Sequence, residues 1–215
     1  AVYLHSGGTS GQPKTIELSA YAINTLAFQV QFVMEEPDFN GRHMLGVLPM
    51  FHGFGLCMGI HAMLCVGGTD TLMPKFKADQ TIDLIKKNRV NYVIGVPTLF
   101  ESLLNHPKFT GKHLQNLRRA YVGGDFVATK LKEDFSRVAK EWGSTAELLE
   151  GYGLTEMVTV LSVNTPSNKR PDTVGHPLPG IGVKILDVAN QSEVPMGVCG
   201  EIAVTGETMM IGYLH

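Results

Sequence analysis

A glycine- and hydroxyl-rich segment near the start of the chain has the residue types of a phosphate-binding loop. Residues 6–15 read SGGTSGQPKT, and Lys14 adds a positive charge to the run. Glycines let the backbone approach a ligand closely, while hydroxyl, amide and ammonium groups donate hydrogen bonds to phosphate oxygens. Flexible polar hairpins have the same composition, but the Pro-Lys ending and the helix expected after it favour phosphate binding.

The segment matches none of the common nucleotide-binding fingerprints. The pattern GxxxxGK[ST] fits except at its second glycine, where Pro13 has no amide hydrogen to donate. Elsewhere in the chain, residues 53–58 and 151–156 begin like the pattern GxGxxG. Both fail it, because Met58 and Glu156 stand at its last glycine position. No GxSxG nucleophile elbow occurs in the sequence, which disfavours a serine α/β-hydrolase. The sequence therefore indicates a phosphate loop of another type.

Two further places carry side chains suited to catalysis. Thr155 and Glu156 put a hydroxyl beside a carboxylate, and such a pair can place Mg²⁺ next to a phosphate. The alternative is an ordinary helix cap with a solvated glutamate. His52 follows an aromatic residue in an apolar, glycine-rich loop, where it is either a functional imidazole or a buried histidine with a satisfied hydrogen bond.

The elements that must position these residues are apolar strands alternating with helices. Helices are expected after the N-cap Ser19 and over residues 53–66, 78–88, 97–104 and 131–142, and strands over residues 44–48, 69–73, 90–96, 119–122 and 146–150. This alternation predicts an α/β fold with a doubly wound, mostly parallel sheet flanked by helices. Beyond residue 173, strands at 183–186 and 201–204 follow each other without a helix. We therefore expect an α/β core over residues 1–172 and the beginning of a β-rich subdomain over residues 173–215.

The predicted topology brings the candidate residues together. In open α/β sheets, ligands bind beyond the carboxyl ends of the strands. Four such ends carry unusual residues: positions 49–53, 96–98, 122–125 and 151–156. We expect these four loops to meet at one rim of the sheet.

Composition excludes several classes of protein. The chain is 44% hydrophobic and 18% charged with a net charge of −2, which argues against a nucleic-acid partner bound through bulk positive charge. Three cysteines without a CxxC spacing argue against a disulfide or zinc framework and fit a cytoplasmic protein. Residues 45–66 are apolar and long enough to span a bilayer. Pro49, two histidines and several glycines interrupt them, which favours a buried strand, loop and helix over a transmembrane span.

Four motifs resemble those of one enzyme family. Residues 6–14 resemble the phosphate-loop signature of the adenylate-forming, AMP-binding superfamily, which includes acyl-CoA synthetases, luciferases and peptide-synthetase adenylation domains. Residues 151–156, GYGLTE, resemble its second signature nearly residue for residue. Residues 174–180 and residues 200–206, with the Gly-Tyr pair at 212–213 beyond, resemble its later motifs in the family order.

The resemblance implies an ATP-dependent acid–CoA ligase. ATP and a carboxylic acid would form an acyl-adenylate and pyrophosphate, and coenzyme A would then take the acyl group as a thioester. By similarity, the catalytic side chains would be Lys14, His52, Thr155 and Glu156, with Glu156 holding Mg²⁺. The nucleotide contacts implied by the same motifs are Ser6, Gly7, Gly8, Thr9, Ser10, Gly11 and Lys14 on the phosphates, Thr155 on the α-phosphate, Glu150, Gly151 and Tyr152 beside the adenine, and Gly123 and Gly124 between the adenine and the acyl pocket.

The histidine motif narrows the expected substrate. Residues 51–53, Phe-His-Gly, resemble acyl-CoA synthetases, in which the aromatic-His pair borders the acyl tunnel, whereas peptide-synthetase domains usually carry an aspartate there. We therefore expect a fatty acid or another simple carboxylic acid, and a role in fatty acid metabolism. The alternatives are an adenylation module that loads a carrier protein and a nucleotide-binding protein without ligase chemistry.

The sequence also departs from the family pattern. Gly7, Thr15, Asp125 and Glu150 differ from the residues usual at these positions, which bears on fine geometry and acid preference. The family's upstream subdomain, its ribose-binding aspartate and its C-terminal lid domain with a catalytic lysine have no counterpart among these 215 residues. We expect the 215 residues alone to lack full ligase activity, and a protein that contains them to have it.

Overall fold

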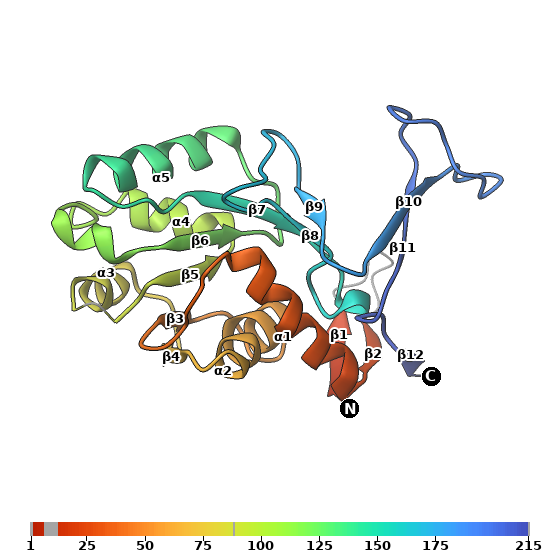
Figure 1. Ribbon diagram of the computed structural model, residues 1–215, viewed down its shortest axis with the longest axis horizontal. Coiled ribbons are helices and arrows are strands. Elements are labelled where there is room, and N and C mark those ends of the chain that lie inside the picture. Colours follow the sequence, from red (N-terminus) through yellow and green to blue (C-terminus); the bar gives the residue numbers. More distant parts are fainter. Residues whose placement is uncertain (1, 7–12, 88, 215) are drawn as a thin grey trace.

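A seven-stranded sheet forms the centre of the molecule (Figure 1). The computed structural model describes residues 2–6, 13–87 and 89–214. The sheet contains β3 (His43–Gly46), β4 (Thr69–Leu72), β5 (Tyr92–Gly95), β6 (Arg119–Val122), β7 (Leu148–Tyr152), β8 (Ser162–Val163) and β9 (His176–Pro177), in the order β4-β3-β5-β6-β7-β8-β9. Strands β3 to β7 pair in parallel, and β8 and β9 are antiparallel. The predicted mostly parallel sheet is confirmed.

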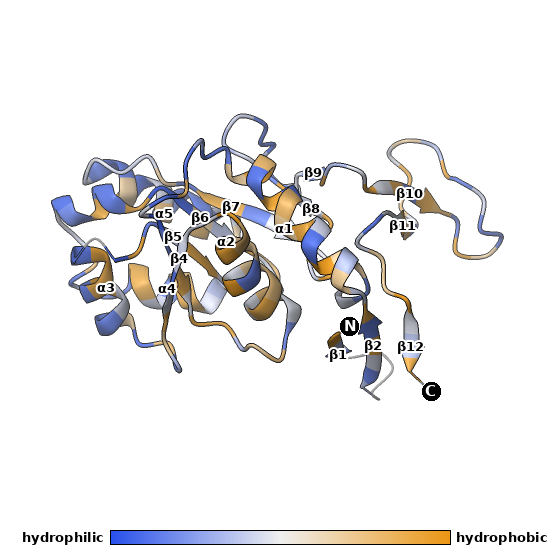
Figure 2. Cartoon of the chain, turned by 60° about the horizontal axis from the view of Figure 1, so that its bottom comes forward, coloured by the Kyte–Doolittle hydropathy of each residue, from blue (hydrophilic) through white to orange (hydrophobic). Residues whose placement is uncertain are grey.

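Helices cover both faces of this sheet. One face packs on α1 (Ala20–Met34), the π-helix η1 (Phe54–His61) and α2 (Ala62–Cys65), and the other on α3 (Ala78–Lys86), α4 (Pro97–Leu104) and α5 (Thr129–Glu141). Side chains alternate between the two cores as strand geometry requires, with Tyr92 and Ile94 on the α1 face and Val93 on the α5 face. In Figure 2, α3 carries both hydrophobic and hydrophilic residues, as expected for a helix with one face on the sheet and the other in solvent. The doubly wound arrangement is therefore also confirmed.

Helix α1 is capped at both ends by contacts that tie it to its surroundings. At its start, the Ser19 hydroxyl accepts a hydrogen bond from the Ala22 amide at 2.9 Å, as predicted. At its end, the Val33 carbonyl would normally accept from the residue four positions on, which is Pro37 and has no amide hydrogen. The Tyr121 hydroxyl donates to this carbonyl instead, at 3.2 Å. The end of α1 is thereby fixed to β6.

The apolar stretch over residues 45–66 folds as a strand, a loop and a helix. Its helical part begins as η1, in which hydrogen bonds run from residue i to i+5, and continues as α2. Gly55 allows close packing, because a Cβ atom there would lie 2.2 Å from the Pro49 carbonyl oxygen. Within the described residues, no helix combines the length and the apolar character needed to cross a membrane.

The two ends of the described chain form small antiparallel sheets that the sequence predicts only in part. Strands β1 (Val2–Ser6) and β2 (Lys14–Leu18) form a hairpin, so a strand that was not predicted lies between the loop and the helix expected after Ser19. Strand β12 (Gly212–Leu214) adds to the free edge of β2. Strands β10 (Gly182–Leu186) and β11 (Glu201–Thr205) pair as a ribbon that projects from the body in Figure 1. Strand β9 lies beyond residue 172 and still belongs to the large sheet. The expected division of the chain at residue 172 stays a prediction.

Candidate active site

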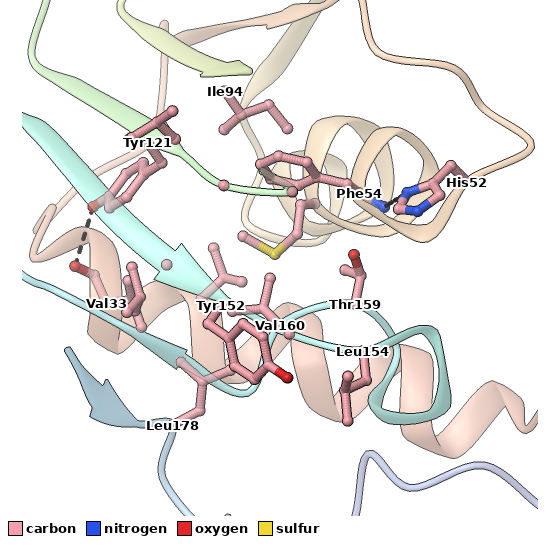
Figure 3. A pocket seen from close by; sticks show the side chains of 18 of the residues that line it. Val33, His52, Phe54, Ile94, Tyr121, Tyr152, Leu154, Thr159, Val160 and Leu178 are labelled. Atoms are coloured by element: carbon pink, nitrogen blue, oxygen red, sulfur yellow. Dashed lines mark hydrogen bonds between the residues drawn. The ribbon is translucent and has the colours of Figure 1, made fainter. Parts of the chain in front are cut away.

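A cavity of about 210 Å³ lies between α1, η1 and the ends of the central strands (Figure 3). Its lining comes from α1, from η1 with the loop before it, from the ends of β5 to β7, and from the segment after β7. The lining residues are Val30, Val33, Met34, Met44, His52, Phe54, Met58, Ile94, Tyr121, Val122, Gly123, Gly124, Gly151, Tyr152, Gly153, Leu154, Thr155, Thr159, Val160, Val163 and Leu178. The topology that brings them together is the one expected from the sequence.

Three of the four predicted loops contribute to the cavity. His52 comes from the loop after β3, Gly123 and Gly124 from the end of β6, and residues 151–155 from the end of β7. Residues 96–98 are not part of the lining, although Ile94 of the same strand is. The convergence of the remaining loops makes this cavity the candidate active site.

The turn after β7 is tightly built, and its glycine is required. A Cβ atom at Gly153 would lie 1.8 Å from the carbonyl oxygen of Thr159, so the backbone permits no side chain there. Val158 and Thr159 have φ values of 57° and 103°, conformations that β-branched residues rarely adopt. Backbone strain of this kind persists only where the surrounding structure holds it, and it concentrates at functional sites. The Thr159 amide donates to Leu154 at 2.8 Å and closes the turn.

The walls of the cavity are mainly apolar. Among the described residues, its lining contains no Asp, Glu, Lys or Arg. His52 lies at one end and Val33 with Tyr121 at the other (Figure 3). The Nδ1 atom of His52 accepts a hydrogen bond from the Phe54 amide at 3.1 Å, which places the proton of the neutral ring on Nε2. Burial raises the pKa of Tyr121 well above its ordinary value, so this tyrosine stays a neutral donor. The cavity therefore suits an uncharged, apolar group.

Glu150 lies next to the cavity residue Gly151, but its side chain points to the opposite face of the sheet. Alternation along β7 directs its side chain to the α5 face, where Lys132 Nζ contacts Glu150 Oε2 at 2.6 Å. Both side chains are mostly buried, at 15% and 18% exposed. Lys132 had no local signal in the sequence. Of the three residues expected beside the adenine, Gly151 and Tyr152 line the cavity and Glu150 does not.

Lys14 and Glu156 are joined by Tyr213, which lies in a family-like motif but was not predicted as a site residue. The Tyr213 hydroxyl donates to Glu156 Oε1 at 2.9 Å, and Lys14 Nζ lies 4.8 Å from the centre of the Tyr213 ring. We call Lys14, Tyr213 and Glu156 the polar cluster. Thr155 lines the cavity and Glu156 belongs to the polar cluster, so the two regions meet at this pair. Lys14 itself does not line the cavity.

Only the two ends of the predicted phosphate loop lie within the described residues. Ser6 and Lys14 face each other as partners in the β1–β2 hairpin. The predicted contacts Gly7, Gly8, Thr9, Ser10 and Gly11 lie outside the described residues. Their role stays a prediction.

The donor set around Glu156 fits a metal that is shared with a ligand. No group of three or more His, Cys, Asp or Glu side chains gathers to hold a metal within the part of the chain that the structure describes. Mg²⁺ commonly takes only one or two protein carboxylates and completes its coordination with substrate phosphates and water. One carboxylate, joined through Tyr213 to the lysine at the end of the predicted phosphate loop, agrees with that pattern.

An open α/β sheet with a cavity at its strand ends and a glycine-rich turn in the cavity wall defines a nucleotide-binding type of α/β enzyme site. The family model for the AMP-binding enzyme matches residues 1–214 of the chain. The chain therefore belongs to the AMP-binding enzyme family, as the resemblance of its motifs predicted.

Curated relatives and solved structures agree with this membership. The chain is 28% identical over 214 residues to a long-chain-fatty-acid–CoA ligase of Bacillus subtilis, covering 99% of this chain and 37% of that protein. It is 27% identical over 215 residues to a probable 4-coumarate–CoA ligase 3 of Dictyostelium discoideum, covering 100% of this chain and 38% of that protein. The crystal structure of ATP-bound MatB from Rhodopseudomonas palustris superposes with a TM-score of 0.87 at 27% identity, covering 98% of this chain and 40% of that one. The chain thus spans well under half the length of these relatives.

Proposed function

We propose that the protein containing this chain is an ATP-dependent acid–CoA ligase that activates an apolar carboxylic acid. The observation that carries the proposal is the apolar cavity whose rim holds His52, Gly123 and Thr155, next to Glu156 and Lys14 in the polar cluster. One region accommodates an acyl group and the other suits a triphosphate. The ligase names of the relatives support the same reaction class.

The proposed reaction needs the two regions to hold two anions together. A carboxylate oxygen attacks the α-phosphorus of ATP, the bond from that phosphorus to the bridging oxygen breaks, and pyrophosphate leaves with the electron pair. The thiol sulfur of coenzyme A then attacks the acyl carbonyl, loses its proton to solvent, and AMP leaves. Positioning and charge neutralisation are the protein's main contributions to such a displacement.

Each candidate residue has a task within this scheme. Lys14 would neutralise phosphate charge, the Thr155 hydroxyl would donate to the α-phosphate, and the Nε2 hydrogen of His52 would donate to the carboxylate of the acid. Glu156 would supply a carboxylate oxygen to Mg²⁺, which offsets the charge of the triphosphate when bound. Gly123 would let β6 and β7 approach closely beside the nucleotide, since a Cβ atom at Gly123 would lie 2.7 Å from the Gly151 oxygen.

The finer statement of the proposal is that the acid is a fatty acid. The lining offers no charged partner, among the described residues, for a second carboxylate or an amine on the substrate. An unpaired charge in such a site would lose much of its hydration without compensation. Both alkyl and aryl acids meet this requirement, and the fatty-acid choice rests on the motif at residues 51–53. A cytoplasmic location fits the three free cysteines.

Acid-dependent exchange between ATP and labelled pyrophosphate in the full-length protein tests the proposal. We expect exchange only when an apolar acid is present, with thioester formation after coenzyme A is added. A panel of alkyl, aryl, dicarboxylic and amino acids separates the substrate classes. Release of phosphate without acid-dependent exchange would identify a nucleotide hydrolase, and acyl transfer to a phosphopantetheine protein in place of coenzyme A would identify a carrier-loading module. The 215 residues alone are expected to give no sustained turnover, because they correspond to about 37% of a relative's length.

A further inference from the structure

Tyr213 occupies a central place in the polar cluster, although the motif resemblance assigns no role to its side chain. It joins β12 to two segments that are far away in the sequence, β2 through Lys14 and the turn after β7 through Glu156. Its hydroxyl and its ring contact different partners. The hydroxyl contact can therefore be removed by substitution while the ring contact is kept.

Strand pairing fixes the backbone of Tyr213 relative to Lys14. Tyr213 pairs with Ile16 in the β12–β2 register. Lys14 lies two residues before Ile16 and so on the same face of the sheet, where diagonal neighbours are within reach of long and aromatic side chains. An ammonium group near an aromatic face is attracted by the ring's quadrupole. The ring thus limits where the Lys14 side chain extends.

A second set of bonds fixes Glu156. The Met210 amide donates to the Glu156 carbonyl at 2.7 Å, and the Ile211 amide donates to Glu17 at 2.9 Å, so the strand is anchored just before Tyr213. The Tyr213 hydroxyl binds Oε1 of Glu156, and Oε2 has no hydrogen-bond partner among the described residues. A phenolic hydroxyl carries its proton at neutral pH and so acts as the donor in this bond. One carboxylate oxygen is therefore held and the other stays open to a cation.

We propose that Tyr213 is a positioning residue that holds the Glu156 carboxylate and the Lys14 ammonium in place for a magnesium-bound triphosphate. It contacts neither the reacting atoms nor the acid. The inference rests on the proposed function, because it assigns the cluster to the nucleotide of that reaction. Without the hydroxyl, Glu156 must be ordered by the cation itself, and the entropy of that ordering weakens binding.

Equilibrium binding of ATP to the full-length protein, measured calorimetrically with excess Mg²⁺ and again in EDTA, tests the role of the hydroxyl. Tyr213→Phe removes the bond to Glu156 and keeps the ring beneath Lys14. We expect it to reduce the gain in ATP affinity that Mg²⁺ provides by about 2- to 10-fold, the range for ordering one additional side chain on binding. Affinity in EDTA should stay unchanged. Tyr213→Leu, which also removes the ring, should weaken ATP binding in both conditions.

A matched control comes from the neighbouring hairpin. The Tyr3 hydroxyl donates to Glu17 Oε1 at 3.4 Å, which is another exposed Tyr–Glu contact on the same small sheet. Tyr3→Phe should leave both ATP affinities unchanged, and thermal unfolding should show that Tyr213→Phe remains folded.

Two outcomes would overturn the inference. In one, Tyr213→Phe keeps the full magnesium-dependent gain. In the other, Tyr213→Phe binds Mg-ATP more tightly, which would make the contact a competitor of the cation rather than its support. Either result leaves the proposed function standing if the wild-type protein still catalyses acid-dependent exchange. Absence of that exchange in the wild type would count against the proposed function itself.

Discussion

The cavity and the polar cluster meet at one pair of residues but are held in different ways. Cavity residues such as Met44, Ile94 and Tyr121 belong to the buried core on the α1 face of the sheet. The polar cluster lies nearer the surface, with Tyr213 37% exposed, and its side chains are joined by one hydrogen bond and one cation–ring contact. Packing therefore fixes the shape of the cavity, the proposed acyl site, whereas a few polar contacts fix the geometry of the polar cluster, the proposed phosphate site. Substitutions should separate these two dependencies.

The largest effect is expected where the two regions share a support. Gly153→Ala would place a methyl group 1.8 Å from the Thr159 carbonyl oxygen, and the turn carrying Thr155 and Glu156 must shift. Because misplacement by about 1 Å can cost about 100-fold in rate, we expect acid-dependent ATP–pyrophosphate exchange to fall at least that far, together with the melting temperature. Exchange kinetics and thermal unfolding of the full-length variant measure both.

Gly212→Ala is the control for that substitution. Its methyl group would meet nothing within 4 Å, and its backbone is not in the left-handed region. We expect stability to change by no more than about 0.5 kcal/mol. Wild-type activity in Gly153→Ala would show that the turn is not the common support of the two regions.

A substitution confined to the cavity should change the choice of acid and leave nucleotide binding alone. Val33→Phe narrows the end of the cavity near Tyr121, opposite His52 (Figure 3). Loss of space for one or more methylenes is worth about 1–3 kcal/mol, so we expect kcat/KM for the longest acids to fall about 10-fold or more. Short acids and the KM for ATP should be unaffected. Steady-state kinetics over a series of chain lengths provides the measurement.

The same Val→Phe substitution on the β10–β11 ribbon tests whether the position of the substitution matters. Val183→Phe makes an identical change at an exposed position outside the cavity, and it should not alter the chain-length profile. An unaltered profile in Val33→Phe would mean that the acyl group binds elsewhere. A raised KM for ATP in that variant would mean that the two regions are not separable.

The smallest effect is expected at a site that belongs to neither region. Asp70 lies on β4, and its two carboxylate oxygens are buried without a hydrogen-bond partner among the described residues. Burial raises the pKa of Asp70 from 3.8 to about 7. The folded state thus keeps this proton at pH values where the unfolded state has released it. Stability contributed by this group falls as pH rises from about 4 to 7, and the cost is complete above pH 7.

Asp70→Asn removes this ionisation and should raise the melting temperature by a few degrees at pH 8. Each kcal/mol of unfolding free energy corresponds to a shift of about 2–4 °C. The advantage should shrink steadily towards pH 5. ATP–pyrophosphate exchange should be unchanged, which separates global stability from effects on the site. Equal melting temperatures of both proteins at pH 8 would show that Asp70 is solvated or paired in the full-length protein.

The elements that the sequence predicts well are those whose local pattern agrees with their environment. Short apolar strands such as β6 and the capped helix α1 carry their own signals, and the strand-end rule then places His52, Gly123 and Thr155 at one cavity. Strands β8 and β9 contain two residues each, too few for a periodic signal, and β1 and β2 flank a loop whose composition obscured them. Tyr213 was missed because its partners are contributed by distant strands and turns, not by neighbours in sequence.

The pairing of β12 with β2 has a consequence for biosynthesis. Strand β2 ends at Leu18 and β12 begins at Gly212, so nearly the whole described chain must be translated before the two can meet. At about 5–20 residues per second, the outer edge of β2 waits roughly 10–40 s on the ribosome. During that interval it is an unpaired edge of the kind that recruits other strands, and chaperone protection of the nascent hairpin would be most valuable then. The proposed phosphate-binding geometry thus cannot form until β12 has been synthesised.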